Sequence, residues 1–547
     1  MERIRPFLMI TLIFLGLLLW QAWEDKHNPQ IKPDPVTQSN SYDTNVLPSR
    51  DSDSDVPKPP ISANKNVPAN NDPNEPTELE RIETDVFNLG FSSKGGLIAE
   101  LLLKDYPISI NRPNDYVEML NTSNLNFFAY QNGLAGDENL PNHNSQYDLE
   151  FLGFENTKDK DNGFLTAVFK HSKNNITVKK TYRIEANNYL INVEYLIQNN
   201  SSSAIAVHNY EQLKRKVISS RNGLIYTYAG AVFSTPDNRY EKYDFDDLSD
   251  QPIKEKNYNS WIGNMQHYFV AALIPPPSLN YSYYSKTFPG TNEYTVGLVS
   301  DGYNIEPNKS IKLQSSFYVG PKTQPVLQEI APGLDLTVDY GILWFLSKPL
   351  FITLSFIYEI VRNWGWAIII LTILIKLIFY PLSAAGYRSM AKLKTVQPKM
   401  MAIKERYSTD KTQMNQAMMK LYKDEKINPL GGCFPILVQI PVFIALYWVL
   451  LESVEMRQAP FVGWINDLSS KDPFFVLPVL MGLSMWVQQK LNPPPVDPIQ
   501  AKVMQFLPIM FTAFFAFFPS GLVLYWLANN VLSILQQWRI TQQLEKK

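Results

Sequence analysis

The stretch IIILTILIKLIFYPL, residues 368–382, decides the fold, because a single lysine interrupts an apolar run of the kind that crosses membranes. Lys376 lies within this run and not at a helix end, where its side chain would simply reach water. A lysine at the bilayer centre costs about 2.5–3.5 kcal/mol, so such residues usually face protein or a water-filled cavity. Thr372 lies one helical turn earlier on the same face. This face is the first candidate for a functional site; the alternative is a lysine that snorkels to the membrane interface.

The composition excludes several classes of protein. The chain has 547 residues, enough for several domains, and its 50 basic and 52 acidic side chains nearly balance, so the overall charge indicates no partner. The single cysteine, Cys433, excludes an intramolecular disulfide and a cysteine-cluster metal site. The five histidines show no HExxH spacing, which argues against a zinc enzyme, and no GxxxxGK[ST] motif indicates a P-loop ATPase. We therefore expect no metal or other cofactor and no catalytic residue.

The N-terminal 80 residues predict a membrane anchor and a linker. Residues 6–23 are almost wholly apolar, and a helix of this length spans about 27 Å, which suits a bilayer core. Two arginines precede the run and two acidic residues follow it, so the positive-inside rule puts the N-terminus in the cytoplasm. A cleaved signal peptide is the alternative, but residues 19–23 offer no small-x-small cleavage site. Residues 24–80, rich in Pro, Asn, Ser and Asp, predict a disordered acidic linker.

Residues 81–330 predict a large antiparallel β domain. Short alternating runs recur between Asn, Gly and Pro clusters, at residues 97–103, 164–169, 177–184, 189–197, 268–273, 294–299 and 311–319. This pattern is typical of a β-sandwich. The many Tyr and Asn residues would suit a carbohydrate-binding face, although ordinary strand and turn composition is the preferred explanation. The histidines of this domain are scattered and are interpreted as ordinary surface or core residues: His143, His171, His208 and His267.

Residues 331–547 predict the membrane core of the chain. Residues 339–362 are interpreted as a helix that lies on the outer membrane surface, and the second span then runs inward from Trp364 and Trp366 to about Leu382. Residues 384–428 carry ten basic and four acidic side chains (10 − 4 = +6), which marks a cytoplasmic loop. Apolar spacings of three and four predict an antiparallel helical hairpin there, and its charge could also contact anionic lipid or ribosomal RNA.

Four further apolar stretches follow, at residues 433–451, 473–489, 503–518 and 522–538. With the anchor and the second span they predict six transmembrane helices and two cytoplasmic termini. Tyr525, Asn529 and Ser533 are spaced by four and share a stripe, which with Thr372 and Lys376 could line a polar cavity. Hydrogen bonding between helices is the alternative explanation of such polar residues, and it is preferred for Ser484 and Asn530.

Several motifs carry a resemblance to a known family. They are Asn428-Pro429-Leu430-Gly431-Gly432-Cys433-Phe434-Pro435, Gln439-Ile440-Pro441-Val442-Phe443, Ala459-Pro460-Phe461 and Phe518-Pro519-Ser520-Gly521-Leu522-Val523-Leu524-Tyr525-Trp526. In this order, within residues 334–547, they closely resemble the YidC/Oxa/Alb family of membrane protein insertases. The long exported domain after a first anchor is most similar to the Gram-negative bacterial form. The resemblance implies that the β domain is a periplasmic supersandwich, similar to sugar-mutarotase folds but without sugar chemistry.

The resemblance also implies a function. It predicts an insertase and chaperone that inserts and folds integral membrane proteins in the bacterial inner membrane, alone or with the Sec translocon. The substrate-binding groove would be hydrated and lined by Lys376, Thr372, Gln439, Tyr525 and Trp526. The family usually has arginine at the position of Lys376, and tyrosine is common at that of Trp526, so the chain departs from the pattern at both. The expected partners are nascent membrane proteins, the Sec translocon, the ribosome and membrane lipid, and not DNA.

Three other classes of protein stay open as alternatives. A solute transporter or channel with a polar cavity would show internal repeats or paired broken helices, and the sequence has no convincing repeat. A membrane-anchored carbohydrate enzyme would need paired carboxylates, and whether Asp244, Asp246 and Asp247 converge with another acid is open. An intramembrane protease would need a nucleophile beside Lys376, for which only Thr372 and Ser383 are near in sequence.

Overall fold

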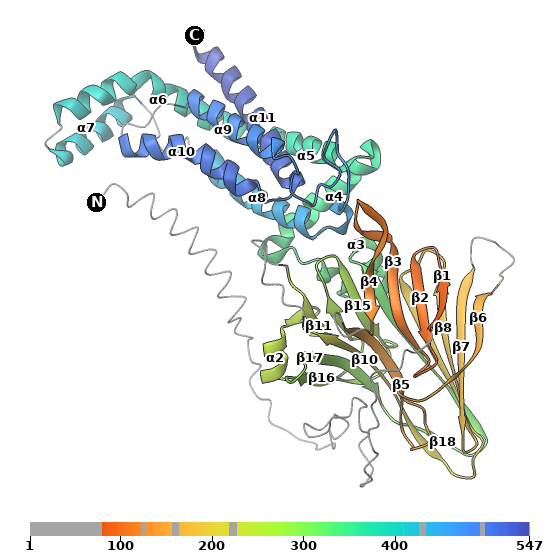
Figure 1. Ribbon diagram of the computed structural model, residues 1–547. Coiled ribbons are helices and arrows are strands. Elements are labelled where there is room, and N and C mark those ends of the chain that lie inside the picture. Colours follow the sequence, from red (N-terminus) through yellow and green to blue (C-terminus); the bar gives the residue numbers. More distant parts are fainter. Residues whose placement is uncertain are drawn as a thin grey trace. The chain divides into compact units, whose positions relative to one another are not determined.

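The structure is a computed structural model that describes residues 79–122, 127–155, 163–217, 227–407, 410–425, 434–492 and 498–545. The predicted anchor, and all of the predicted linker except its last two residues, lie outside the described residues. Most of the first family motif, residues 428–433, lies outside them too. The described chain consists of a β domain followed by a helical core (Figure 1).

Two antiparallel sheets form the β domain, as the alternating sequence predicts. The first has ten strands, in the order β1-β2-β3-β4-β5-β10-β17-β16-β13, with β18 paired to β10. Its strands are β1 (Leu79–Glu83), β2 (Phe87–Ser92), β3 (Leu97–Ser109), β4 (Arg112–Asn121), β5 (Phe128–Gly136), β10 (Ile205–Lys216), β13 (Lys254–Asn257), β16 (Tyr281–Phe288), β17 (Glu293–Ser300) and β18 (Tyr303–Ile305). The second has nine strands, in the order β12-β11-β14-β15-β19-β9-β8-β7-β6. Its strands are β6 (Asp148–Glu155), β7 (Phe164–Lys173), β8 (Ile176–Glu185), β9 (Leu190–Asn199), β11 (Gly230–Ser234), β12 (Glu241–Tyr243), β14 (Trp261–Met265), β15 (Phe269–Ile274) and β19 (Lys309–Pro321).

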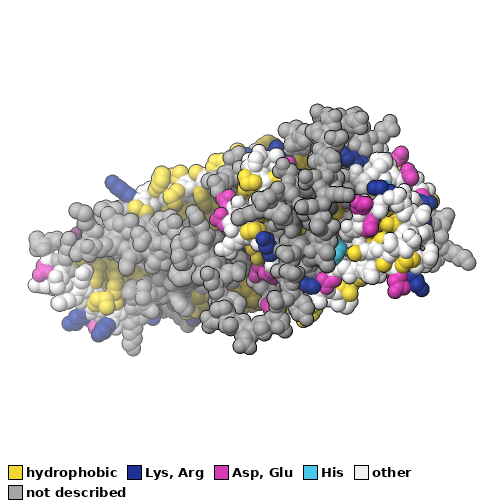
Figure 2. Space-filling view, turned by 90° about the horizontal axis from the view of Figure 1, so that it is seen from below, with side chains coloured by type: hydrophobic (Ala, Val, Ile, Leu, Met, Phe, Trp, Pro, Cys, Tyr) yellow, Lys and Arg dark blue, Asp and Glu magenta, His cyan; other side chains and the backbone are white. Residues whose placement is uncertain are grey.

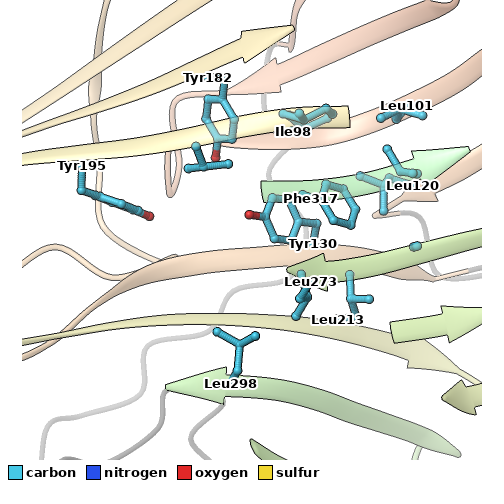
Figure 3. Packing of buried hydrophobic residues seen from close by; sticks show 14 of the residues in the cluster. Ile98, Leu101, Leu120, Tyr130, Tyr182, Tyr195, Leu213, Leu273, Leu298 and Phe317 are labelled. Atoms are coloured by element: carbon cyan, nitrogen blue, oxygen red, sulfur yellow. The ribbon is translucent and has the colours of Figure 1, made fainter. Parts of the chain in front are cut away.

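The hydrophobic core of this domain lies between the two sheets. In β8 every second side chain is buried, because successive side chains of a strand point to opposite faces. Tyr130 of β5 stacks on Phe317 of β19, with ring centroids 4.1 Å apart, so the stack joins a strand of each sheet (Figure 3). Burial of this continuous apolar cluster is what stabilises a sandwich of two sheets.

The core also contains polar groups that the sequence analysis did not predict. Lys180 is fully buried and donates hydrogen bonds to the carbonyl oxygens of Gly95 (2.8 Å) and Gly96 (3.1 Å). Burial lowers the pKa of Lys180 well below its ordinary value, and the Glu211 carboxylate opposes that shift. The hydroxyl groups of Tyr130, Tyr182 and Tyr195 point toward a common region of the core (Figure 3). A buried polar network restricts how the two sheets can pack, because a buried polar group without a partner is costly.

The β3–β4 hairpin extends beyond the rest of its sheet. The pairing of β2 with β3 ends at Phe87 opposite Leu103, whereas β3 continues to Ser109. The six further residues correspond to about 20 Å of strand. Ser109 pairs with Arg112, so Ile110 and Asn111 form a two-residue turn at the tip. The overhang is therefore a two-stranded ribbon with little support from its own sheet.

The helical core contains the apolar helices that the sequence predicts. Its helices are α4 (Trp344–Val361), α5 (Trp364–Ile378), α6 (Tyr380–Arg406), α7 (Lys411–Asp424), α8 (Phe434–Glu452), α9 (Val476–Leu491), α10 (Pro498–Phe515) and α11 (Ser520–Glu545). The predicted count of six spans is not confirmed. Among the described residues, only Gly341–Val361 is, by length and composition, a single helix that could cross a membrane, and this is the segment expected to lie on the membrane surface. The bent pair α5–α6 passes the same test when taken together. Several of the other apolar helices are short.

The bend between α5 and α6 corrects the predicted position of Lys376. The two helices meet at Phe379 with an angle of 69° between them, so α5 ends at Ile378 and not near Leu382. Lys376 consequently lies in the last turn of α5, contrary to the prediction that it lies away from a helix end. The apolar run hid the bend because Pro381, within the first turn of α6, fits a helix start without a break in hydropathy. A cation in a last turn interacts favourably with the helix dipole.

The helices α6 and α7 form the predicted hairpin. Val396 and Met400 of α6 are buried against a seam that includes Met418 and Leu421 of α7. Asp410 caps α7, since its carboxylate accepts hydrogen bonds from the backbone N–H groups of Thr412 and Gln413. The narrow apolar seam leaves the many lysines of this hairpin exposed or half-buried.

A buried set of contacts joins the β domain to the helical core. Lys322, which follows β19, is 1% exposed and lies 3.1 Å from the carboxylate of Glu452 at the end of α8. His267 donates from Nε2 to the carbonyl oxygen of Leu451 (2.9 Å). Arg457 and Gln458, in the loop between α8 and α9, donate to the carbonyl oxygen of Pro107 in β3, at 2.6 and 2.8 Å. One hydrophobic cluster also includes residues of both regions.

The histidines of the β domain have ordinary roles, as predicted. Besides His267, the ring nitrogens of His143, His171 and His208 contact the Tyr210 hydroxyl, the Gln146 carbonyl and the Ser300 carbonyl. In the described part of the chain no group of three or more His, Cys, Asp or Glu side chains could hold a metal ion. Where described residues are visible on the face seen in Figure 2, acidic and basic side chains are interspersed.

Candidate functional site: a polar cluster beside the bend of α5

The polar cluster is centred on the ammonium group of Lys376. Its Nζ donates to Oγ of Ser533 in α11 (2.8 Å) and to Oε1 of Gln439 in α8 (3.4 Å). The side chain is half-buried. Among the described residues it makes no ion pair, so neutral oxygens alone hold the cation.

A chain of hydrogen bonds extends the cluster across three helices. The Gln439 side-chain amide donates to Oδ1 of Asn529, and Ser533 Oγ donates to the backbone carbonyl of Asn529 (2.7 Å). Gln439 therefore accepts from Lys376 with its oxygen and donates to Asn529 with its nitrogen. Asn529 and Ser533 are one turn apart on α11, which is why the sequence spacing of four placed them on one stripe.

The other predicted groove residues lie elsewhere. Thr372 is 1% exposed, and its hydroxyl donates to the carbonyl of Ile368 in its own helix (2.7 Å). Trp526 belongs to an aromatic cluster and packs edge-on against Phe443, with centroids 4.6 Å apart. The Tyr525 ring also stacks near Phe443, at 6.2 Å. The structure thus brings Lys376 and Gln439 together, but it does not bring the Thr372 hydroxyl or Trp526 into the polar cluster.

Tyr525 is a special case because its hydroxyl is buried. It faces Gln439 but makes no hydrogen bond of ordinary geometry to any residue that the structure describes. A buried hydroxyl without a partner carries a desolvation cost. Tyr525 therefore borders the cluster without being held by it.

Asn530 and Ser484 form a hydrogen bond between helices, as their sequence positions predict. Asn530 Nδ2 donates to Oγ of Ser484 in α9 (3.0 Å), and Ser484 Oγ donates to the Met481 carbonyl (2.6 Å). Both side chains are buried. This is hydrogen bonding between helices and not part of the cluster around Lys376.

Two members of the region were not predicted. Tyr387 of α6 contacts the Ser533 side chain, and Gln536 of α11 donates to the backbone carbonyl of Tyr380 (3.3 Å). Tyr387 comes after the bend, in the stretch interpreted as the start of a cytoplasmic loop. Without knowledge of the bend, no sequence signal connects it with Lys376.

Residues of two family motifs have structural roles where α5 and α11 begin. Asn363 caps α5, and its Nδ2 donates to the carbonyl oxygens of Pro460 and Phe461 (both 3.3 Å). Ser520, in the turn that starts α11, donates through both its backbone N–H (2.7 Å) and its hydroxyl (2.6 Å) to the Ser470 carbonyl. The loop between α8 and α9 thus holds two helix starts in place.

Comparisons with known proteins identify relatives of this chain. Two family models match the chain: "YidC periplasmic domain" over residues 80–353, and "60Kd inner membrane protein" over residues 356–547. A membrane protein insertase YidC from Thioalkalivibrio sulfidiphilus is 44% identical over 557 residues, covering 100% of this chain and 99% of the relative. That from Methylococcus capsulatus is also 44% identical, over 552 residues, with 100% and 99% covered. Among solved structures, an active YidC insertase crystal structure matches at 18% identity with a TM-score of 0.39, covering 84% of this chain and 94% of the other.

Proposed function

The chain belongs to the YidC family of membrane protein insertases, and from this premise we propose that it receives client segments in a hydrated groove at Lys376. Its relatives are named as insertases, so a solute transporter or channel is not favoured. The family descriptions identify an inner membrane protein with a periplasmic domain, which corresponds to residues 80–353.

One observation carries the proposal: among the residues that the structure describes, the Lys376 ammonium has only neutral partners. Ser533 and Gln439 satisfy its hydrogen bonds without cancelling its charge. An acidic group arriving about 4 Å away would be attracted by about 4 kcal/mol at an effective dielectric constant of about 20. A lysine already paired with a carboxylate would attract an acidic group much less, because the carboxylate neutralises its charge.

In the proposed mechanism, the cluster holds an acidic tail of the client while the client's apolar helix moves into lipid. Burial of apolar surface, at about 25 cal/mol per Å², drives that step. The membrane potential assists a charged tail by about 2.3 kcal/mol per charge per 100 mV. The tail would gain further polar contacts if it replaced the hydrogen bonds that now join Gln439, Asn529 and Ser533 to one another.

The proposal also includes the topology of the chain and its partners. Both termini would be cytoplasmic, and the basic α6–α7 hairpin would lie on the same side, where it receives clients or contacts the ribosome. The Sec translocon would act as a partner for some clients. The relatives' name supports membrane proteins as the clients. No nucleotide site is expected, so the step is partitioning without hydrolysis.

Substitutions of Lys376 test the proposal in reconstituted vesicles. A client with an acidic N-terminal tail should insert poorly with Lys376→Glu and normally with Lys376→Arg, which keeps the positive charge. A matched client whose tail is neutral should be affected much less. Equal insertion of the acidic client by the Lys376→Glu variant, with unchanged thermal unfolding of that variant, would contradict the charge-capture mechanism.

A further inference from the structure

The tip of the β3–β4 hairpin has two large apolar side chains that no other described element covers. Ile108 is 53% exposed and Ile110 is 42% exposed. Tyr106, two residues earlier on β3, packs edge-on against Phe269 of the domain core, with centroids 5.2 Å apart. The pairing of β3 with β4 is irregular on both sides of Pro107, and beyond this point the large apolar side chains of the tip no longer pack on the core and are exposed.

The base of this tip is attached to the loop that joins two membrane helices. Arg457 and Gln458 both donate to the carbonyl oxygen of Pro107, which is adjacent to Ile108. They follow the last residue of α8 by only five and six positions. An overhanging two-stranded ribbon is marginally stable alone in water, so this attachment decides where the tip lies. The two hydrogen bonds to Pro107 hold the tip close to the end of the apolar helix α8.

The same loop and the neighbouring helix starts also expose large apolar residues. Phe474 is 68% exposed, and Val462, Trp464 and Phe475 are exposed as well. At the start of α4, Trp344 and Phe345 are 61% and 60% exposed. Tryptophan and other aromatic residues concentrate where a membrane protein meets the lipid headgroups. Ile108 and Ile110 thus continue a region with the composition of a membrane interface.

We infer that the β3–β4 tip, Ile108 to Asn111, contacts the outer leaflet of the lipid bilayer and supports the β domain on the membrane surface. Its partner is a lipid surface and not a peptide or a sugar. The Arg112–Asp115 ion pair (3.0 Å) beside the tip neutralises two charges that would otherwise face the headgroups. The contact is independent of the groove at Lys376 and of client insertion.

Site-specific fluorescence tests this inference on the full chain. Cys433→Ser leaves no other cysteine, so Ile108→Cys or Ile110→Cys can carry a single environment-sensitive label. The protein is reconstituted in phosphatidylethanolamine–phosphatidylglycerol vesicles, with and without lipids that carry a nitroxide near the headgroup. The emission of both labels should shift to shorter wavelength, and the nitroxide lipids should quench it.

Leu279 provides the matched control. It is 39% exposed, close to the value for Ile110. β15 begins two residues after His267, which contacts α8, and runs away from that contact, so Leu279 follows the distant end of the strand. A label at Leu279→Cys should be quenched by aqueous iodide and not by the nitroxide lipids.

Two results would overturn the inference. Iodide quenching at 108 and 110 as strong as at 279 would show that the tip lies in water. Protection from iodide without quenching by the nitroxide lipids would show that protein covers the tip, either the N-terminal part of this chain or a second molecule.

Discussion

Lys322 and Glu452 form an ion pair of 3.1 Å that is almost completely buried between the β domain and the helical core. The Lys322 ammonium also donates to the Thr337 carbonyl (3.1 Å), so the charge has both a counter-ion and a backbone partner. His267 lies 3.8 Å from the other oxygen of Glu452. The two regions are thereby joined by charges that water does not screen.

Removal of one member of this pair should loosen the attachment strongly. Lys322→Met leaves the Glu452 carboxylate buried without its counter-ion, which costs about 3–5 kcal/mol. Lys322→Met combined with Glu452→Leu should recover much of that loss, because no unpaired charge is left. Thermal unfolding of the detergent-solubilised chain measures both effects.

The exposed ion pair of Lys312 and Glu194 (2.8 Å) is the control for the substitutions of Lys322 and Glu452. Lys312→Met should cost less than about 1 kcal/mol, as surface ion pairs do. Similar losses for Lys322→Met and Lys312→Met would mean that the buried pair does not hold the junction.

His267 should make the junction sensitive to acid. Burial, with a further contribution from the Lys322 charge, lowers the pKa of His267 to about 4. The unfolded chain takes up this proton near pH 6.5 and the folded chain does not, so stability is full above that pH and falls as the pH drops to about 4. The loss is about 3 kcal/mol.

His267→Gln keeps a hydrogen-bond donor for Leu451 and should remove this loss. Burial raises the pKa of Glu455 to about 7, which has the opposite effect over part of the same range. The informative quantity is therefore the difference in unfolding free energy between the variant and the unmodified chain at pH 7 and at pH 4.5. A difference that stays constant with pH would contradict the assignment to His267.

Gly482 should be required for the close packing of α9 on α10. A Cβ at this position would overlap with Oγ1 of Thr512. Gly482→Ala should therefore cost about 1–3 kcal/mol through overpacking, seen as a lower unfolding temperature. Addition of Thr512→Ala should restore part of the stability. Gly290→Ala, where a Cβ would meet nothing within 4 Å, should change little.

Gln439 should matter to the groove more than Tyr525 does. Gln439→Leu removes the bridge between Lys376 and Asn529, and hydrogen bonds to charged groups are worth about 1.5–3 kcal/mol. The Gln439→Leu variant should therefore insert an acidic-tailed client less efficiently than the unmodified chain does. The Tyr525 hydroxyl faces Gln439 without a hydrogen bond of ordinary geometry to any described residue, so with Tyr525→Phe stability should be unchanged or slightly higher and insertion should persist. The reverse ranking in the vesicle assay would argue against a cluster centred on Lys376.

The sequence predicted those parts of the fold that depend on a regular pattern. The alternation at residues 177–184 and 311–319 corresponds to β8 and β19, and the spacing at residues 393–407 corresponds to the α6 face of the hairpin seam. The order of strands in each sheet could not be predicted, because β5 pairs with β10, some 70 residues later, through contacts that no local pattern records. The alternation puts Lys180 on the buried face of β8, but its hydrogen-bond partners Gly95 and Gly96 lie some 85 residues earlier, so no local pattern indicates them.

The candidate site was predictable only in part. A spacing of four indicated that Asn529 and Ser533 share a stripe, and a charge in an apolar run indicated Lys376. The bend at Phe379 was not visible, because Pro381 fits a helix start and the hydropathy stays high across it. The position of Lys376 near a helix end, and the nearness of Tyr387, both follow from that bend.

The shortness of α5 has a consequence for the surrounding membrane. Its 15 residues measure about 22 Å, and the 16 of α9 about 24 Å, whereas the hydrocarbon layer is about 30 Å thick. A bilayer accommodates helices that are too short mainly by becoming thinner around them, at a modest cost per ångström of hydrophobic mismatch. We expect the lipid beside these two helices to be locally compressed, which would narrow the barrier that a polar segment must cross.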